Sequence, residues 1–314
     1  MARLLLLTGY TAVGKTELSL KLAEALNAEI LSCDSVQIYR CMDIGSAKPS
    51  KADCQRIKHH GIDMVDIHDK FDIQQYVDYA LGVMADVAGR GKNLLIVGGS
   101  GFYLKSFYYP VMDDVAIPED VRAKVQMLYH DFGLDGLVRK INELSGDALG
   151  NLDMKNPRRI ARALERCLVT GRTVEENVAG FMSKSCPFSN HRKITVLLTR
   201  NCMGDRVRAR IIKMIEDGLI DEVKHLMEIG IESNRSAARA IGYGETIAFI
   251  KSGSGDLDRL IDSMVRNTHR LIRKQRTWFK RQIPVDLEIC LDDYSIDESF
   301  DLIHMFLIQN YIWN

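Results

Sequence analysis

A glycine-rich segment close to the N-terminus carries residues suited to chemistry. "GYTAVGKT" has the spacing G-x-x-x-x-G-K-T. Glycines let backbone N–H groups turn toward an anion, and a helix that begins at the loop adds positive potential. Lys15 is suited to a terminal phosphate, and the Thr16 hydroxyl is suited to ligate Mg²⁺. The segment predicts a phosphate-binding loop, whose residues are Gly9, Tyr10, Thr11, Ala12, Val13, Gly14, Lys15 and Thr16.

The residues that a hydrolytic nucleotide-binding enzyme needs are incomplete. The apolar run in "LLIVGGSG" ends in glycines and Ser100, without the Asp that helps to hold the metal in P-loop ATPases and GTPases. Asp34 instead ends the run "ILSCD". Because the carboxyl ends of parallel strands line the ligand crevice, we expect Asp34 near the phosphates. There it would ligate Mg²⁺ or accept a proton from a nucleophile.

Strands that alternate with helices are expected to position this loop. The continuous apolar run Leu4–Thr8 is typical of a strand covered on both faces. After the loop, Leu18, Leu22 and Leu26 recur at helical spacing, and "AEILS" and "KNLLIVGGSG" repeat the strand pattern. The order predicts an α/β fold with a P-loop NTPase-like parallel sheet flanked by helices.

The pattern changes near residue 110, where a long, apparently all-helical stretch begins. One apolar stripe in it consists of Ile160, Leu164, Cys167 and Leu168. "RKITVLLTR" then returns to a strand pattern. We expect an all-helical insertion domain over residues 112–190 within a catalytic core of 1–111 and 191–314. Two further helical segments are expected over Val207–Leu226 and Leu257–Arg281.

Composition narrows the class of protein. The 314 residues are 46% hydrophobic and 27% charged, which is ordinary for a soluble globular chain. No apolar run approaches the roughly 18 residues that a membrane helix needs. The seven cysteines are odd in number and form no C-x-x-C pair. They argue against a disulfide framework and a zinc site, and favour the reducing cytoplasm.

Positive charge is locally concentrated although the formal net charge is zero. "VRNTHRLIRKQRTWFKR" holds seven Arg or Lys and no acid, and Arg266, Arg270 and Arg273 share one helical face. In the insertion, Arg159, Arg162 and Arg166 also share one helical face. Such stripes suit contact with a phosphate backbone. The alternative for either cluster alone is a solvated helix face with scattered ion pairs.

Seven motifs, in order from about Leu4 to Phe279, resemble those of the tRNA dimethylallyltransferase family. "GYTAVGKT" resembles G-P-T-A-S-G-K-T, and "DSVQIYRCMDIGSAKP" resembles D-S-x-Q-V-Y-x-x-M-D-I-G-T-A-K-P. "HHGID", "VGGSGFYLK" and "NPRRIARALERCLVTGR" resemble H-H-L-I-D, V-G-G-T-G-L-Y-L-K and N-D-x-x-R-I-x-R-A-L-E-V-x-x-x-T-G-R. "AIGYGE" and "RKQRTWF" resemble A-I-G-Y-K-E and K-R-Q-x-T-W-F.

The resemblance implies transfer of the dimethylallyl group of dimethylallyl diphosphate to the exocyclic amine of the adenine 3′-adjacent to the anticodon of tRNA. The loop then binds a diphosphate that departs, and no phosphoryl group is transferred. By the family pattern, Asp34 accepts the proton of the amine and Ser100 helps to position the adenine or the diphosphate. Lys15, Arg206 and a Mg²⁺ cofactor on Thr16 stabilise the departing charge.

The resemblance also implies which residues contact the anticodon stem-loop. They are Asp34, Ser35, Val36, Gln37, Ser100, Arg122, Arg158, Arg159, Ile160, Ala161, Arg162, Arg239, Ala240, Ile241, Gly242, Tyr243, Gly244, Arg273, Lys274, Gln275, Arg276, Thr277, Trp278, Phe279 and Lys280. A stacked adenine must be swung out of the loop to react. The chain is expected to work as a monomer in the cytoplasm, with no membrane partner.

Four residues depart from the family pattern, and three other functions stay open. Tyr10 replaces Pro, Thr199 replaces Asp, Gly244 replaces Lys and Lys274 replaces Arg. A P-loop small-molecule kinase would use the same loop to bind ATP, with the insertion as its lid. An isopentenyltransferase that acts on free adenine nucleotides, or a tRNA-binding protein without activity, would share the motifs. The basic stripes favour a large RNA substrate.

Overall fold

The computed structural model describes residues 3–111 and 115–310. The chain divides into two compact units, which we call the core unit (residues 1–108 and 188–314) and the helical unit (109–187). The boundary that the sequence suggests between residues 111 and 112 touches residues 112–114, which lie outside the described residues.

The core unit is built on a six-stranded sheet in which all neighbouring strands are parallel. The strand order is β3-β2-β4-β1-β5-β6. The strands are β1 Arg3–Gly9, β2 Ala28–Cys33, β3 His59–His60, β4 Asn93–Gly98, β5 Arg192–Thr199 and β6 Leu287–Cys290. This topology confirms the predicted parallel α/β fold. Strands β4 and β5, which flank the helical unit in the sequence, both pair with β1.

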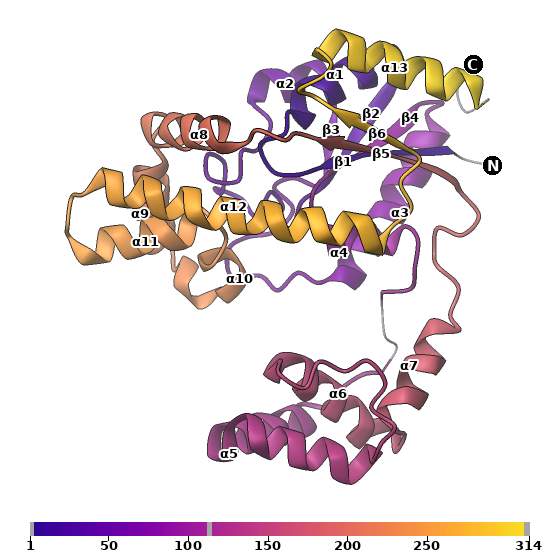
Figure 1. The fold of residues 1–314 in the computed structure, drawn as a ribbon, viewed down its shortest axis with the longest axis vertical. Helices are drawn as coiled ribbons and strands as arrows, with labels where there is room; N and C mark the ends of the chain where they lie inside the picture. The colour runs from indigo at the N-terminus through magenta and orange to yellow at the C-terminus, as the bar shows by residue number, and fades with distance from the viewer. Residues whose placement is uncertain (1–2, 112–114, 311–314) are drawn as a thin grey trace. The chain divides into compact units, whose positions relative to one another are not determined.

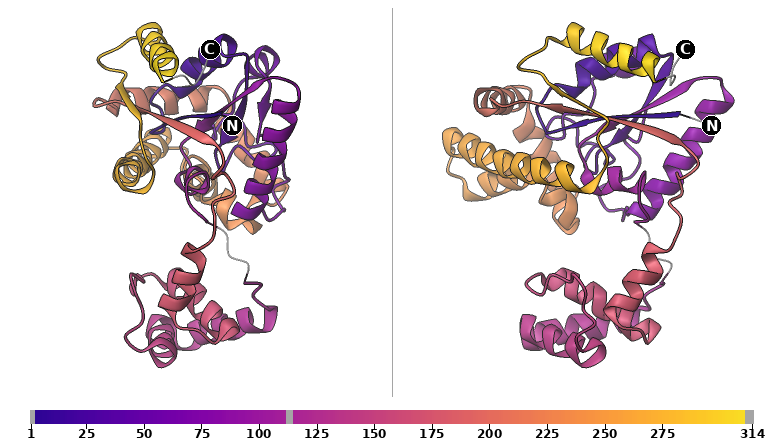
Figure 2. Two further views of the ribbon diagram at one scale, coloured as in Figure 1. Left: turned by 90° about the vertical axis from the view of Figure 1, so that its right-hand side faces the viewer. Right: turned by 45° about the vertical axis from the view of Figure 1, so that its right-hand side comes forward.

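Helices cover both faces of the sheet (Figures 1 and 2). They are α1 Lys15–Ala25, α2 Lys51–Arg56, α3 Ile73–Gly89, α4 Gly101–Ser106, α8 Gly204–Glu216, α9 Leu219–Glu228, α10 Arg235–Ala238, α11 Tyr243–Ser252, α12 Leu257–Gln282 and α13 Ile296–Gln309. Helices α1 and α13 lie on one side, and α3, α4 and α12 lie on the other. None of the described helices is long and apolar enough to cross a bilayer.

The principal core lies between the sheet and helices α1 and α13. Leu5 and Leu7 of β1 and Leu18 and Leu22 of α1 are fully buried there, together with Leu307 of α13. A strand covered by helices needs apolar side chains on both faces, which is why β1 reads as an uninterrupted apolar run. The core fixes the end of β1, from which the phosphate-binding loop departs.

The segment Val207–Leu226 is helical as expected, but it forms two helices rather than one. Helix α8 ends at Glu216, and α9 begins at Leu219. Between them Gly218 has a φ of 102°, a left-handed conformation that costs glycine least. The chain turns there, and α9 packs against α11.

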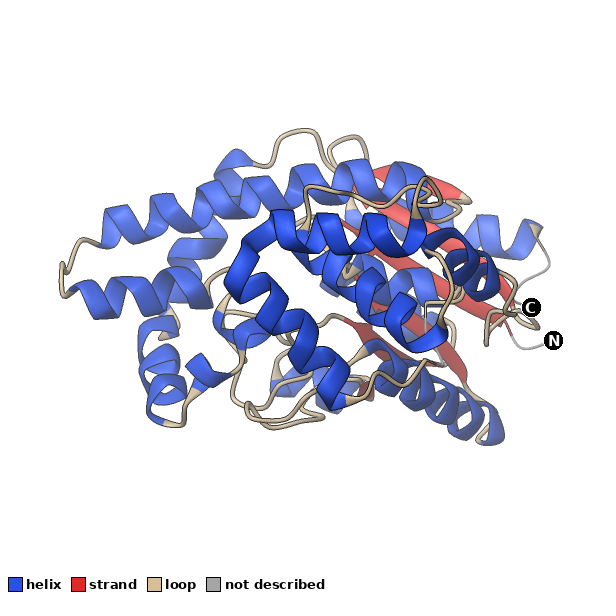
Figure 3. Ribbon diagram, turned by 90° about the horizontal axis from the view of Figure 1, so that it is seen from below, coloured by secondary structure: helices blue, strands red, loops and turns tan. Residues whose placement is uncertain are grey.

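The helical unit consists of α5 Glu119–Ser145, α6 Pro157–Thr170 and α7 Val174–Met182, without a strand among its described residues (Figure 3). Its core contains Leu137 and Ile141 of α5 and Ile160 and Leu164 of α6. The predicted stripe is correct for three of its four residues. Leu168 is 41% exposed, because it lies past the edge of the buried face.

Candidate functional site

The phosphate-binding loop joins the end of β1 to the start of α1. No side chain caps the N-terminus of α1, so its first N–H groups are available to an anion. Lys15 turns back onto the loop, and its Nζ donates to the carbonyls of Gly9 at 3.0 Å and Tyr10 at 2.9 Å. Burial, together with the nearby charge of Arg210, lowers the pKa of Lys15 to about 8. A bound anion would give this ammonium group a negatively charged partner.

Two arginines of α8 approach the same loop. Arg206 donates from Nε to the carbonyl of Ala12 at 3.1 Å. Arg210, one turn later, lies in the cleft, and burial lowers its pKa while the charge of Asp34 opposes the shift. Arg210 was not among the predicted site residues. Its spacing of four from Arg206 is the signal that could have found it, because such pairs share a helix face.

Asp34 follows β2 at the carboxyl edge of the sheet. Its Oδ1 accepts a hydrogen bond from the backbone N–H of Val36 at 2.9 Å, which fixes the turn. Ser100, after the neighbouring strand β4, accepts from the N–H of Ser35 at 3.0 Å through its Oγ. The backbone N–H of Ser100 donates in turn to the carbonyl of Cys33 at 3.2 Å. These bonds join the ends of two adjacent strands and hold both predicted side chains at one edge.

A cleft of about 1200 Å³ in the core unit collects the predicted catalytic residues. Lys15, Asp34, Ser100 and Arg206 all line it. So do the loop residues from Thr11 to Thr16 and, of the expected RNA contacts, Ser35, Val36, Gln37, Arg239, Ala240, Ile241, Gly242, Lys274, Gln275 and Trp278. A second hollow of about 600 Å³ shares Arg206 and is lined by His269, Arg273 and Arg276.

The other expected RNA contacts lie outside this cleft. The side chains of Ile160, Tyr243 and Phe279 are at most 1% exposed, so they pack in the interior. The remaining ones are at least partly exposed: Arg122, Arg158, Arg159, Ala161, Arg162, Gly244, Arg273, Arg276, Thr277 and Lys280.

Two glutamines of the expected RNA-binding set hold the cleft together. Gln275 of α12 accepts from the N–H of Thr11 at 3.0 Å and donates to the carbonyl of Gly99 at 3.1 Å. It therefore ties the phosphate-binding loop to the segment after β4. Gln37 uses both ends of its amide inside the protein, where it accepts from Ser32 Oγ at 2.8 Å and donates to loop carbonyls.

Tyr10 fills space beneath the loop. Its ring is 3% exposed and lies 6.2 Å from the ring of Phe279, between ring centroids. The guanidinium carbon of Arg276 lies 5.5 Å from its centroid, a cation–π contact. Burial raises the pKa of the Tyr10 phenol. The aromatic ring thus packs the phosphate-binding loop against α12.

Thr199 is buried at the end of β5, and a different residue supplies the acid beside Arg200. Asp292 pairs with Arg200 at 2.9 Å, and Arg200 donates from Nε to the carbonyl of Val13 at 3.0 Å. Asp292 also accepts from the N–H of Asn201 at 2.7 Å. The pair braces the phosphate-binding loop from the side of β6.

The cleft contains an oxygen donor of the kind that Mg²⁺ prefers, because Thr16, with its side-chain hydroxyl, is one of its lining residues. Mg²⁺ is usually held by one or two protein oxygens together with water and phosphate oxygens. Among the described residues, no three His, Cys, Asp or Glu side chains converge on a possible ion.

Comparisons with known proteins agree with this geometry. The tRNA dimethylallyltransferase of Opitutus terrae is 45% identical over 284 residues, which are 90% of this chain and 91% of that protein. A crystal structure of a tRNA isopentenylpyrophosphate transferase from Bacillus halodurans has a TM-score of 0.70 at 32% identity, over 98% of this chain and 96% of that one.

A eukaryotic dimethylallyltransferase structure has a TM-score of 0.81 over 98% of this chain and 80% of that chain. At 20% identity, that likeness supports the fold alone. The family model described as IPP transferase matches residues 37–282. The chain therefore belongs to the IPP transferase family.

Proposed function

We propose that this chain transfers the dimethylallyl group of dimethylallyl diphosphate to the exocyclic amine of the adenine 3′-adjacent to the anticodon in tRNA. One observation carries the proposal: the phosphate-binding loop after β1 and the Asp34 carboxylate after β2 line a single cleft. The names of the related proteins support the same reaction. The phosphate-binding loop alone would equally suit a kinase, but the family does not favour that alternative.

The diphosphate would lie on the loop and at the start of α1. Backbone N–H groups, Lys15 and the guanidinium groups of Arg206 and Arg210 would surround it. Fixed positive charge stabilises a leaving group most when it is already oriented in a site shielded from water. A bound Mg²⁺ on the Thr16 hydroxyl would supply further positive charge to the diphosphate oxygens.

The reaction breaks one bond and forms another. The allylic carbon–oxygen bond breaks, and its electron pair leaves with the diphosphate. The lone pair of the adenine amine forms the new carbon–nitrogen bond, and the amine loses a proton. Asp34 would accept this proton, because its carboxylate lines the cleft at the end of β2, beside Ser100. The Ser100 hydroxyl would orient the adenine.

The RNA would bind through exposed arginines rather than through the whole surface. Arg158 and Arg159 occupy the first turn of α6, where no acid is present. Cations there face the positive end of the helix dipole, which costs stability unless an anion binds. We propose a monomer, because the catalytic residues of one chain line one cleft. We also propose that it works in the cytoplasm, because its seven described cysteines are free.

The direct test is mass spectrometry of nucleosides from unmodified tRNA incubated with the purified chain and dimethylallyl diphosphate. The expected product is adenosine that carries one five-carbon prenyl unit. AMP serves as the competing acceptor, and ATP with Mg²⁺ as the competing donor. Prenylation of AMP but not of tRNA would make the chain an adenine-nucleotide isopentenyltransferase. Phosphoryl transfer from ATP without prenylation would make it a kinase.

A further inference from the structure

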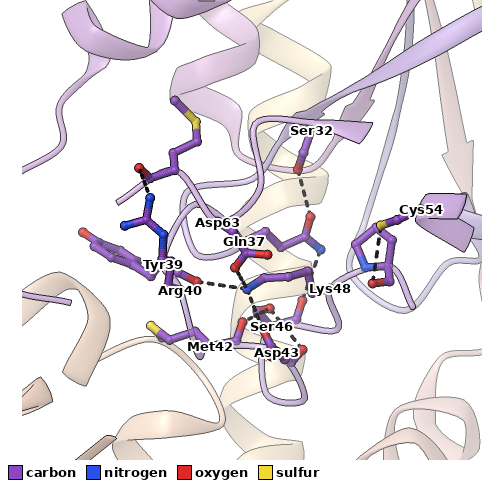
Figure 4. Close-up of polar contacts among 12 residues, drawn as sticks. Ser32, Gln37, Tyr39, Arg40, Met42, Asp43, Ser46, Lys48, Cys54 and Asp63 are labelled. Carbon is purple, nitrogen blue, oxygen red and sulfur yellow. Dashed lines mark hydrogen bonds and ion pairs between the residues drawn. The ribbon is translucent and has the colours of Figure 1, made fainter. Parts of the chain in front are cut away.

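The segment Met42–Lys48, which we call the wall loop, forms part of the cleft without being a helix or a strand. Gly45, Ser46 and Ala47 line the cleft. A loop that shapes a binding site must be held by other residues, since it has no ladder of backbone bonds of its own. Figure 4 shows the polar side chains that hold it from the β2 side.

Gln37 and Lys48 brace the wall loop from within. The Gln37 amide donates to the carbonyls of Ser46 at 3.4 Å and Ala47 at 3.1 Å (Figure 4). The Lys48 side chain is only 5% exposed, and it pairs with Asp43 and with Asp63 at 2.6 Å. A buried lysine that is fully paired in this way fixes the curvature of the loop.

Glu222 of α9 holds the other side of the wall loop. Its carboxylate accepts from three successive backbone N–H groups, those of Asp43 at 3.1 Å, Ile44 at 2.7 Å and Gly45 at 3.2 Å. The carboxylate thus acts as an internal anion in a nest of backbone N–H groups. Hydrogen bonds to a charged acceptor are about twice as strong as neutral ones.

Tyr243 of α11 completes the brace. Its hydroxyl donates to Glu222 at 2.8 Å and accepts from the N–H of Ser46 at 3.1 Å. A Cβ atom at Gly45 would lie 2.6 Å from the Tyr243 ring, so only glycine allows this approach. Four consecutive N–H groups of the wall loop are therefore satisfied by Glu222 and Tyr243.

The wall loop lies at the end of the cleft away from the phosphate-binding loop. Helix α12 spans both ends, because Gln275 binds Thr11 and Met264 lies near Gly242. Gly242 in turn lies beside Gly45, since a Cβ atom at Gly242 would be 3.7 Å from the carbonyl oxygen of Gly45. Met264 and Gln275 are eleven residues apart on the helix, which is about 16 Å.

The charge of this end suits an RNA backbone rather than a hydrocarbon, because exposed Arg239 lines it. Ser46 and Gln37 also line it, but their side chains are bonded within the protein, so they shape its surface. Arg239 forms no ion pair with any described residue. We propose that Glu222 is a positioning residue that fixes the wall loop as the surface against which the RNA adenine is placed. The inference rests on the proposed function and adds a residue that does not line the cleft.

The test is Glu222→Gln, with Asp221→Asn as the matched control. Both changes remove one negative charge from the first turn of α9. The Asp221 side chain is 82% exposed and pairs only with Lys224 among the described residues. Glutamine keeps the size of Glu222 but places an NH₂ group against N–H donors. We expect kcat/KM for tRNA to fall about tenfold or more, while KM for dimethylallyl diphosphate stays within about twofold.

Tyr243→Phe is the second variant, because it keeps the buried ring if Glu222→Gln fails to fold. Tyr243→Phe should also lower kcat/KM for tRNA and leave KM for dimethylallyl diphosphate nearly unchanged. The double variant should lower kcat/KM for tRNA by less than the product of the two single effects. Normal kcat/KM for tRNA in both single variants would overturn the inference. So would a rise in KM for dimethylallyl diphosphate as large as the fall in kcat/KM for tRNA. If the wild-type protein does not prenylate tRNA, the proposed function itself is wrong.

Discussion

Asp34 has one carboxylate oxygen committed to structure, since its Oδ1 accepts from the N–H of Val36. Asn at this position keeps that bond and the size of the side chain but cannot accept a proton at neutral pH. We expect Asp34→Asn to bind tRNA within about twofold of the wild type and to lose turnover by on the order of a hundredfold. A gel-shift titration and a single-turnover prenylation assay would measure the two effects.

A matched control for Asp34→Asn is Asp66→Asn. Asp66 is an exposed acid that pairs with Arg40 at 2.9 Å and does not line the cleft. It should keep both binding and turnover. If Asp34→Asn turns over at the wild-type rate, Asp34 is not the proton acceptor.

Lys15 gives a second prediction, about pH. Its pKa in the free protein is lowered to about 8, chiefly by burial. A bound diphosphate favours the charged amine, so it raises the pKa of Lys15. At a pH where the free lysine is neutral, Lys15 therefore takes up a proton when diphosphate binds. The affinity for inorganic diphosphate should therefore fall as the pH rises above about 8. Isothermal titration calorimetry at several pH values would measure it.

Lys15→Arg is the control for this pH dependence, because a guanidinium stays charged throughout. The ionisation of diphosphate affects both proteins equally. The ratio of the two affinities should thus be constant below about pH 7 and change above pH 8. Parallel pH profiles for the two proteins would contradict a lowered lysine pKa.

Residue types and spacing predicted many of the residues that line the candidate site, because its phosphate-binding loop is local in sequence. The loop from Gly9 to Thr16 carries its own geometry, and Asp34 follows a recognisable strand. Gln37 and Gln275 show the limit. Each is an exposed-looking amide in a polar motif, and its internal partners lie on other segments. Only the folded chain brings those partners together.

At the scale of elements, the meeting of α4 and α12 gives a third prediction. The Trp278 ring packs directly on the backbone of Gly101, and a Cβ atom there would lie 2.7 Å from the ring. Gly101→Ala should displace the indole or the helix and lower the free energy of unfolding by about 1–3 kcal/mol. Because Trp278 lines the cleft, prenylation should fall as well.

Gly82→Ala is the matched control, measured in the same urea titrations. Gly82 lies inside α3, and a Cβ atom there would meet nothing within 4 Å. Alanine is favoured over glycine in a helix interior, so this change should raise the free energy of unfolding by about 0.5–1 kcal/mol. Equal effects of the two substitutions would refute a tight contact between α4 and α12.

Elements with long periodic patterns were predictable, and short ones were not. Helix α1 was predictable from Leu18, Leu22 and Leu26, because the buried face of a helix repeats in sequence. Strand β3 has only two residues, so no pattern can mark it. The turn at Gly218 went unrecognised because apolar spacing continues on both sides of it.

At the scale of the whole molecule, charge is distributed unevenly although its formal sum is zero. The first turn of α6 carries Arg158 and Arg159 without an acid, and Arg162 follows on the same helix. Arg162 lies 3.5 Å from the carboxylate of the largely buried Glu165, measured from its guanidinium nitrogen. Helix ends usually place acids in the first turn. This reversal is what we expect of a surface that binds a polyanion.

Replacing Arg158, Arg159 and Arg162 by Ala together should weaken tRNA binding without changing KM for dimethylallyl diphosphate. Each lost phosphate contact lowers the slope of log affinity against log salt by about 0.7–0.9, so the loss of three contacts lowers it by about 2–3. Lys124→Ala in the same unit is the control, because Lys124 is exposed and already paired with Asp120 at 3.0 Å. An unchanged slope in the triple variant would mean that these arginines form only a solvated face. The RNA would then be held by the core unit alone.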